Sequence, residues 1–120
     1  MTNRENIEYL FKEEGMRSKE FLNNLFHENF QLEWDSSSGN SISDKSFIIN
    51  LSDEINANYE ISYFEISHLI EEKNQIVVKY NHKVATIENP KEIMLITKAV
   101  AIWTFEAGKI TNGYLISKPN

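Results

Sequence analysis

Apolar residues recur at helical spacing in three segments of the first half of the chain. The first segment follows Thr2, which together with Glu5 has the pattern of a capping box, and its apolar face consists of Ile7, Leu10 and Phe11. The second follows Ser18 as N-cap and buries Phe21, Leu22, Leu25 and Phe26. The third, capped by Ser41 or Ser43, carries Ile48, Leu51 and Ile55. The pattern predicts three helices, the first of which stops near Gly15.

Strict alternation of apolar and polar residues indicates strands elsewhere. The stretch "NFQLEWD" (residues 29–35) alternates and predicts a half-buried strand, which a polar loop at 36–41 separates from the third helix. From Tyr59 onward, turns at 71–74, 88–91 and 106–109 divide the chain into four strands, and Gly108 can supply the positive φ of the last turn. This order predicts one α+β domain, residues 1–120, with a four-stranded antiparallel meander.

The turns also predict which residues share a face of the sheet. If Ile70 pairs with Ile76, then His68 faces Val78 and Phe64 faces His82. The second turn then pairs Tyr80 with Ala99 and His82 with Thr97, and the same face continues through Leu95, Ala101 and Trp103. Ile61 and Tyr63 have the other parity, which a bulge near Tyr63 would explain. The helices should pack on this face.

The opposite face of the third strand of the meander is also apolar. Its residues are Met94, Ile96, Val100 and Ile102. An apolar patch of this kind is typical of an interface, so these four residues predict a homodimer.

Composition narrows the function classes. A net charge of -6 with scattered Lys and Arg argues against nucleic acid and against an anionic membrane surface as partners. The chain has no cysteine, which excludes disulfides, thiolate metal sites and a cysteine nucleophile. No signal-peptide h-region and no run of eighteen apolar residues occurs, so the expectation is a cytoplasmic protein.

Two stretches resemble a known family. "LFHENFQLEWD" (25–35) resembles the helix-to-strand entry, and "WTFEAGKI" (103–110) resembles the last hairpin, of the nuclear transport factor 2-like superfamily. This superfamily includes ketosteroid isomerase, scytalone dehydratase and the SnoaL group of polyketide cyclases. The resemblance implies a bent sheet that helices wrap into a cone around a pocket. It also implies a dimer, since many members pair through the outer sheet face.

The resemblance argues against steroid isomerase activity. The position of the isomerase's general-base Asp is occupied by Trp34, with Asp35 one residue later on the opposite parity. The oxyanion-hole Asp falls on Ala101, and the oxyanion-hole Tyr falls near Tyr9 only if one residue is inserted. Enolisation requires a base and oxyanion donors together, and the base is missing.

The predicted pocket residues are Trp34, Tyr80, His82, Thr97, Ala99, Ala101 and Trp103. His82 is the main candidate for acid–base chemistry near neutral pH, and Tyr9 is a second. The alternative for His82 is a hydrogen bond to a Tyr or Thr in a closed core, and the tyrosines could equally be packing residues. Trp34 would either stack on a planar ligand or plug the cavity.

A metal site and a cofactor are not expected. His68 and His82 would lie roughly 13 Å apart along the sheet, and nothing in the sequence brings His27 near either of them. No glycine-rich phosphate loop or nucleophile elbow occurs. Three hypotheses remain: a protein that binds a small apolar or aromatic molecule; a cyclase-, dehydratase- or isomerase-type enzyme that uses His82; and a dimeric interaction protein with a closed cavity.

Overall fold

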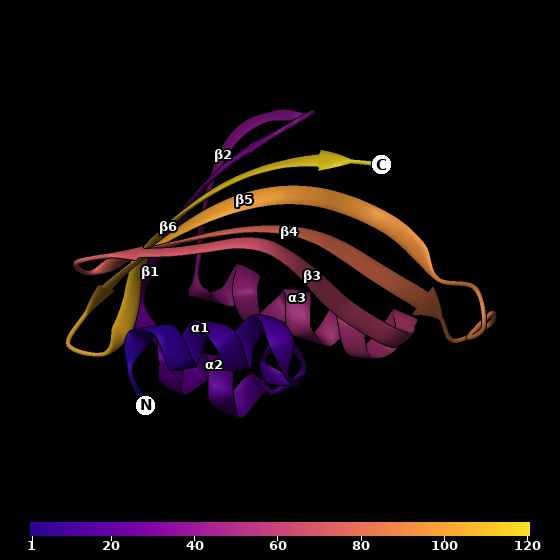
Figure 1. Ribbon diagram of the computed structural model, residues 1–120, viewed down its shortest axis with the longest axis horizontal. Helices are drawn as coiled ribbons and strands as arrows, with labels where there is room; N and C mark the ends of the chain where they lie inside the picture. Colours follow the sequence, from indigo (N-terminus) through magenta and orange to yellow (C-terminus); the bar gives the residue numbers. More distant parts are fainter.

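Six strands form one bent, unclosed sheet, and the helices lie on its concave face (Figure 1). The computed structural model describes all 120 residues. The elements are, in chain order, α1 (Asn3–Lys12), the 3-10 helix η1 (Gly15–Arg17), α2 (Lys19–Leu25), β1 (Phe26–Ser36), β2 (Gly39–Asp44), α3 (Lys45–Asn58), β3 (Tyr59–Glu72), β4 (Gln75–Thr86), β5 (Met94–Glu106) and β6 (Lys109–Pro119). The predicted α+β class is confirmed. None of the helices has the length and apolar character that a bilayer crossing requires.

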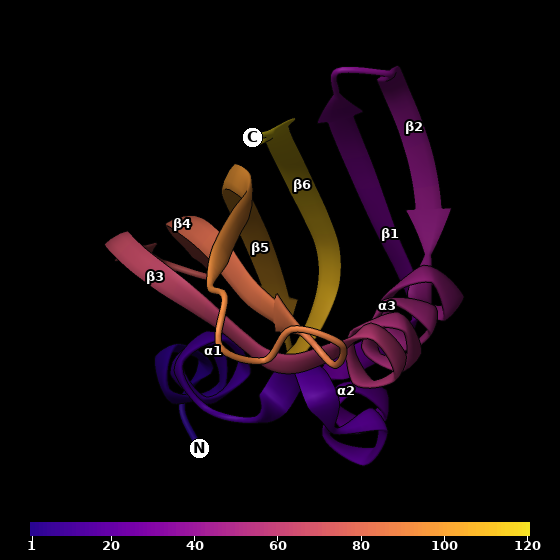
Figure 2. The ribbon, with the colours of Figure 1, turned by 90° about the vertical axis from the view of Figure 1, so that its right-hand side faces the viewer.

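The strand order in the sheet is β2-β1-β6-β5-β4-β3. Neighbouring strands are antiparallel, except that β1 and β6 run parallel. This pairing brings the strand after the second helix beside the last strand of the chain (Figure 2). The predicted meander from β3 to β6 is therefore present, and β1 and β2 extend it at the β6 edge.

The helix starts follow from local capping. The Thr2 hydroxyl accepts a hydrogen bond from the Glu5 backbone N–H, and the Glu5 carboxylate accepts one from the Thr2 N–H, which completes the predicted capping box. Ser18 caps α2 as predicted. The prediction for α3 is wrong, because Asp44 and neither Ser41 nor Ser43 is its N-cap.

Two boundaries also differ from the prediction. Helix α1 ends at Lys12, before Gly15, which begins η1. A Cβ on Gly15 would lie 2.6 Å from Leu10 Cα, so this glycine permits a close approach of the chain to α1. Phe26 starts β1 instead of ending the second helix.

The segment predicted to be a polar loop at 36–41 instead forms the turn and much of the second strand of a hairpin. Strand β2 pairs with β1 from Gln31↔Asp44 to Ser36↔Gly39. Its residues are mostly polar and exposed on both faces, so hydrophobic alternation gives no signal for it. Backbone pairing with β1 supports the strand without a buried side-chain face.

Strand β3 pairs with β4 as predicted in its middle, where Phe64 faces His82 and Ile66 faces Tyr80. The register is wrong toward the turn. Leu69, and not His68, faces Val78 because the pairing shifts between Ile66 and His68. A second irregularity lies between Tyr59 and Ile61, so neither bulge is at Tyr63. His68 consequently pairs with Lys79 and is exposed.

A third bulge changes the facing of residues at the start of β5. Thr97 pairs with His82, but the next pair is Leu95 with Lys83, so Ile96 has no partner on β4. One inserted residue reverses the alternation of everything beyond it. The placement of Met94 and Ile96 on the outer face, and of Leu95 on the inner face, is therefore wrong. Met94 pairs with Val84, a fully buried residue.

The largest core cluster lies between the helices and the sheet. It contains residues of α1, α2 and α3 and of every strand except β2 and β3, including Ile7, Leu10, Leu22, Phe30, Ile76, Val78 and Ile110. Trp103 lies inside this cluster, with ring centroids of Phe11, Phe26 and Phe30 at 6.3, 5.8 and 6.3 Å. Aromatic packing thus closes this end of the concave face.

Candidate functional site

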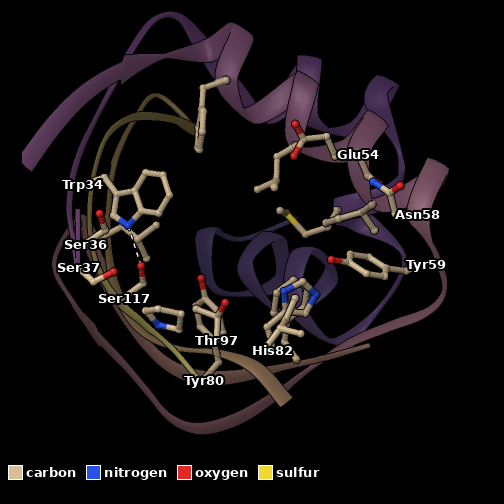
Figure 3. A pocket seen from close by; sticks show the side chains of 18 of the residues that line it. Trp34, Ser36, Ser37, Glu54, Asn58, Tyr59, Tyr80, His82, Thr97 and Ser117 are labelled. Atoms are coloured by element: carbon tan, nitrogen blue, oxygen red, sulfur yellow. Dashed lines mark hydrogen bonds between the residues drawn. The ribbon is translucent and has the colours of Figure 1, made fainter. Parts of the chain in front are cut away.

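A cavity of about 360 Å³ remains between α3 and the other end of the sheet. Four kinds of segment line it: α3, the strands β3 to β6, the β1–β2 hairpin and Met16 of η1. Figure 3 shows side chains of the helix on one side of this space and His82, Thr97 and Tyr80 of the sheet on the other. More than half of its lining residues are hydrophobic.

Trp34 forms one wall of the cavity. Its indole Nε1 donates a hydrogen bond of 2.7 Å to Ser117 Oγ, drawn in Figure 3, and its ring lies 5.6 Å from Phe47 of α3. These two contacts join β1 to β6 and to α3. Trp34 therefore lines the space rather than plugging it, and of the two alternatives for this residue only the stacking role is left open.

His82 lies in the sheet wall and stacks on Phe64, with ring centroids 4.3 Å apart and an interplanar angle of 18°. Its Nε2 is 2.8 Å from Ser62 Oγ. Burial lowers the pKa of His82 from its ordinary value of 6.5 to about 4. The imidazole is thus neutral at pH 7, and one ring nitrogen already has a protein partner.

Tyr80 and Thr97 extend the same wall. Tyr80 pairs with Ala99 and its ring contacts Phe11 and Phe64, at centroid distances of 5.0 and 5.2 Å. Burial raises the pKa of the Tyr80 hydroxyl, so it stays protonated and can donate a hydrogen bond. Thr97 pairs with His82 across the strands.

Three residues predicted for the pocket do not line this cavity. Ala101 and Trp103 share the inward parity of Ala99 but belong to the closed core, at 0% and 5% exposure. Ala99 is 5% exposed and is not among the residues that line the cavity. The alternation along the strand correctly assigns the side chains of these three residues to the inner face of the sheet. It does not show at which residue of the strand the packed core ends and the cavity begins.

Tyr9 is also outside the cavity. It is 37% exposed on α1 and packs against Phe21, with ring centroids 4.6 Å apart. The inward position on this helix belongs to Phe11, whose ring contacts Phe64 and Tyr80. The prediction that Tyr9 acts as a catalytic residue in the cavity loses its structural basis.

The sequence interpretation missed most of the helix wall. Phe47, Leu51, Glu54, Ile55 and Asn58 all line the cavity, together with Tyr59. Their spacing of three, four and seven residues marks one face of α3, and this periodicity was visible in the sequence. It predicted burial of Leu51 and Ile55 but gave no reason to place Glu54 and Asn58 beside a cavity.

The other titratable groups do not assemble into a second site. No group of three or more His, Asp or Glu side chains is placed to hold a metal ion, and His27 and His68 lie outside the cavity. Asp35, on the outer face, accepts a very short hydrogen bond from Tyr114. This bond and a second from Asn40 hold the pKa of Asp35 below its ordinary value.

Comparison with known proteins places the fold. No protein-family model matches the sequence, and no curated protein sequence matches it. Solved structures do. IdmH of Streptomyces antibioticus, a proposed polyketide cyclase, superimposes with a TM-score of 0.75 at 10% identity, over 98% of this chain and 92% of that chain.

Two further structures agree with this placement. A proposed SnoaL-like polyketide cyclase of Shewanella denitrificans gives a TM-score of 0.72 at 14% identity, over 96% of this chain and 89% of that one. A Catenulispora acidiphila protein with a ketosteroid isomerase-like fold was solved in complex with trimethylamine. It superimposes with a TM-score of 0.69 at 11% identity, over 95% of this chain and 85% of that chain. Similarity at this identity establishes fold and leaves activity open. The chain therefore has the fold of the nuclear transport factor 2-like proteins, the fold that SnoaL-like polyketide cyclases share.

Proposed function

We propose that the protein binds a small, mostly apolar or aromatic molecule in the cavity between α3 and the sheet. The observation that supports this most directly is the cavity itself, about 360 Å³ with aromatic side chains on both sides and a few polar groups among them. Trp34 and Phe47 provide ring surface on one side, and Phe64 and Tyr80 provide it on the other. The trimethylamine complex of the Catenulispora protein supports binding of a small molecule by this fold.

A binding role is favoured over acid–base catalysis by the state of His82. A general base is most effective when its pKa lies near the working pH, and burial holds the pKa of His82 at about 4. No acidic or basic side chain hydrogen-bonds to His82, and the partner of its Nε2 is the neutral hydroxyl of Ser62. His82 is therefore suited to orient a ligand by a hydrogen bond, and the cyclase-, dehydratase- or isomerase-type alternative would need a different proton carrier.

A homodimer through the outer sheet face is part of the same proposal. Ile70, Val77, Ile102 and Tyr114 form a continuous cross-strand row on that face, and Val100 pairs with Ile116 in the next row. Ile70 is 57% exposed and Ile116 is 48% exposed. Exposed apolar rows support association with a second copy. Of the residues predicted for this interface, Val100 and Ile102 retain their outward position.

Isothermal titration with 2-naphthol, a flat neutral probe with one hydroxyl, tests the binding function. We expect a Kd on the order of 0.1 mM for a ligand of this size. Leu51→Trp should weaken binding at least tenfold because the larger side chain fills space at the cavity wall. Ile93→Trp, which adds the same ring at a position that is 45% exposed and lies outside both the cavity and the proposed dimer face, should have no effect. Equal binding by the two variants, or none by the wild type, would contradict the proposal.

A further inference from the structure

The lining of the cavity carries a single formal charge at neutral pH, on Glu54. Of the 19 residues that line the cavity, Glu54 is the only Asp, Glu, Lys or Arg. Burial keeps His82 neutral. The ion pairs of the protein involve other carboxylates, those of Glu8, Glu14, Asp53 and Glu65. The carboxylate of Glu54 therefore has no ion-pair partner within the protein.

The helix fixes the place of this carboxylate. Leu51, Glu54 and Asn58 lie on one face of α3 at successive turns, because residues three and four apart are neighbours on a helix. Figure 3 shows Glu54 reaching from α3, across the space from His82 and Thr97. The Asn58 side chain donates a hydrogen bond to the Glu54 backbone carbonyl, at 2.9 Å, and leaves the carboxylate free.

Aromatic rings supply a second attraction for positive charge in the same space. The lining contains five Trp, Tyr or Phe side chains, namely Trp34, Phe47, Tyr59, Phe64 and Tyr80. The faces of such rings carry partial negative charge and attract ammonium groups within about 6 Å. A cavity with rings, one carboxylate and no Lys or Arg favours a cation over a carboxylate or phosphate ligand, because Glu54 repels an anion and no Lys or Arg of the lining offsets this repulsion.

We infer that the ligands of this cavity are organic cations, in which an ammonium group lies beside Glu54 and an apolar body lies between the rings. This inference rests on the proposed binding function and adds the charge of the ligand to it. Glu54 is exposed to solvent at the edge of the cavity, and the solvent screens its charge. The electrostatic preference is therefore small, about two- to fivefold in affinity.

Two probes that differ only in their quaternary atom separate charge from shape. Phenyltrimethylammonium carries N⁺ where tert-butylbenzene carries carbon, and both are titrated by ligand-observed NMR against wild-type protein and Glu54→Gln. We expect the substitution to weaken binding of the cation about two- to fivefold and to leave binding of the hydrocarbon unchanged. Glu60→Gln is the matched control, because it removes the same charge from an exposed side chain next to Tyr59 that does not line the cavity.

The outcomes distinguish this inference from the binding function. Binding of tert-butylbenzene with no loss of cation affinity in Glu54→Gln overturns the inference and leaves the binding function standing. Equal losses of cation affinity in Glu54→Gln and Glu60→Gln overturn it as well, because the overall negative charge of the protein would then explain the effect. Failure of the cation to bind wild-type protein overturns the inference, and failure of every probe, 2-naphthol included, overturns both.

Discussion

Replacing His82 with phenylalanine should remove a pH dependence from the stability of the fold. The folded protein holds the pKa of His82 at about 4, whereas the unfolded chain has the ordinary value of 6.5. Between these values the unfolded state binds a proton that the folded state excludes, so acidification favours unfolding. The contribution of neutral His82 is complete above pH 6.5 and is lost as the pH falls toward 4.

The size of this stability change follows from the difference between the pKa values of His82 in the unfolded and the folded protein. A difference between 6.5 and about 4 corresponds to an upper limit of about 3.4 kcal/mol, and about 2.5 kcal/mol of it is lost by pH 4.5. The ring is partly accessible to solvent, so we expect about half of this, roughly 1 to 1.5 kcal/mol. Phenylalanine keeps the stacking on Phe64 but leaves the Ser62 hydroxyl without its partner, which costs about 1 kcal/mol.

The free energy of unfolding in urea, measured from pH 7.5 to pH 4.5, tests this reasoning. The wild type should be more stable than the variant at pH 7, and the two curves should converge or cross near pH 5. Carboxylates whose pKa is lowered by hydrogen bonds, such as Asp35 and Asp44, titrate in both proteins and cancel in the difference. A difference that stays constant over this range would refute the buried, neutral state of His82.

Two further predictions concern the sheet. Gly113→Ala should destabilise the protein by about 1 to 3 kcal/mol, because the new Cβ would lie 2.8 Å from Trp103 Cζ3 and 3.0 Å from Leu32 Cδ1; an unchanged melting temperature would contradict this packing. Val100→Glu should convert a dimer into a monomer in sedimentation velocity with the fold retained by circular dichroism, and a wild-type protein that is monomeric at high micromolar concentration would remove the basis of the dimer proposal.

Local interactions account for the parts of the structure that the sequence predicted. The Thr2–Glu5 capping box, the Ser18 cap and the turn at Ala107–Gly108, with φ of 51° and 81°, each involve residues a few positions apart. Alternation also predicted the pairing of Phe64 with His82 and of Tyr80 with Ala99. Short-range hydrogen bonds and the two-residue period of a strand act within a segment, so a single sequence carries them.

The positions of the bulges in β3 and β5 depend on the tertiary structure. Extra residues near Ser67 and at Ile96 let the sheet bend over the helices, and they reversed the predicted facing of His68 and Met94. An apolar residue at Ile96 fits either face of a strand. Ile96 lies on the inner face because the sheet curves over α3, and this curvature is a property of the whole sheet.

The position of the cavity has the same origin. Trp34 and Trp103 both have inward parity, yet Trp103 is sealed among Phe11, Phe26 and Phe30 while Trp34 lines an open space. The sequence by itself determined that both rings face the helices. Which of them meets a packed core depends on where α1 and α3 cross the sheet, because side chains more than fifty residues apart in sequence fill one end of the concave face and leave the other end empty.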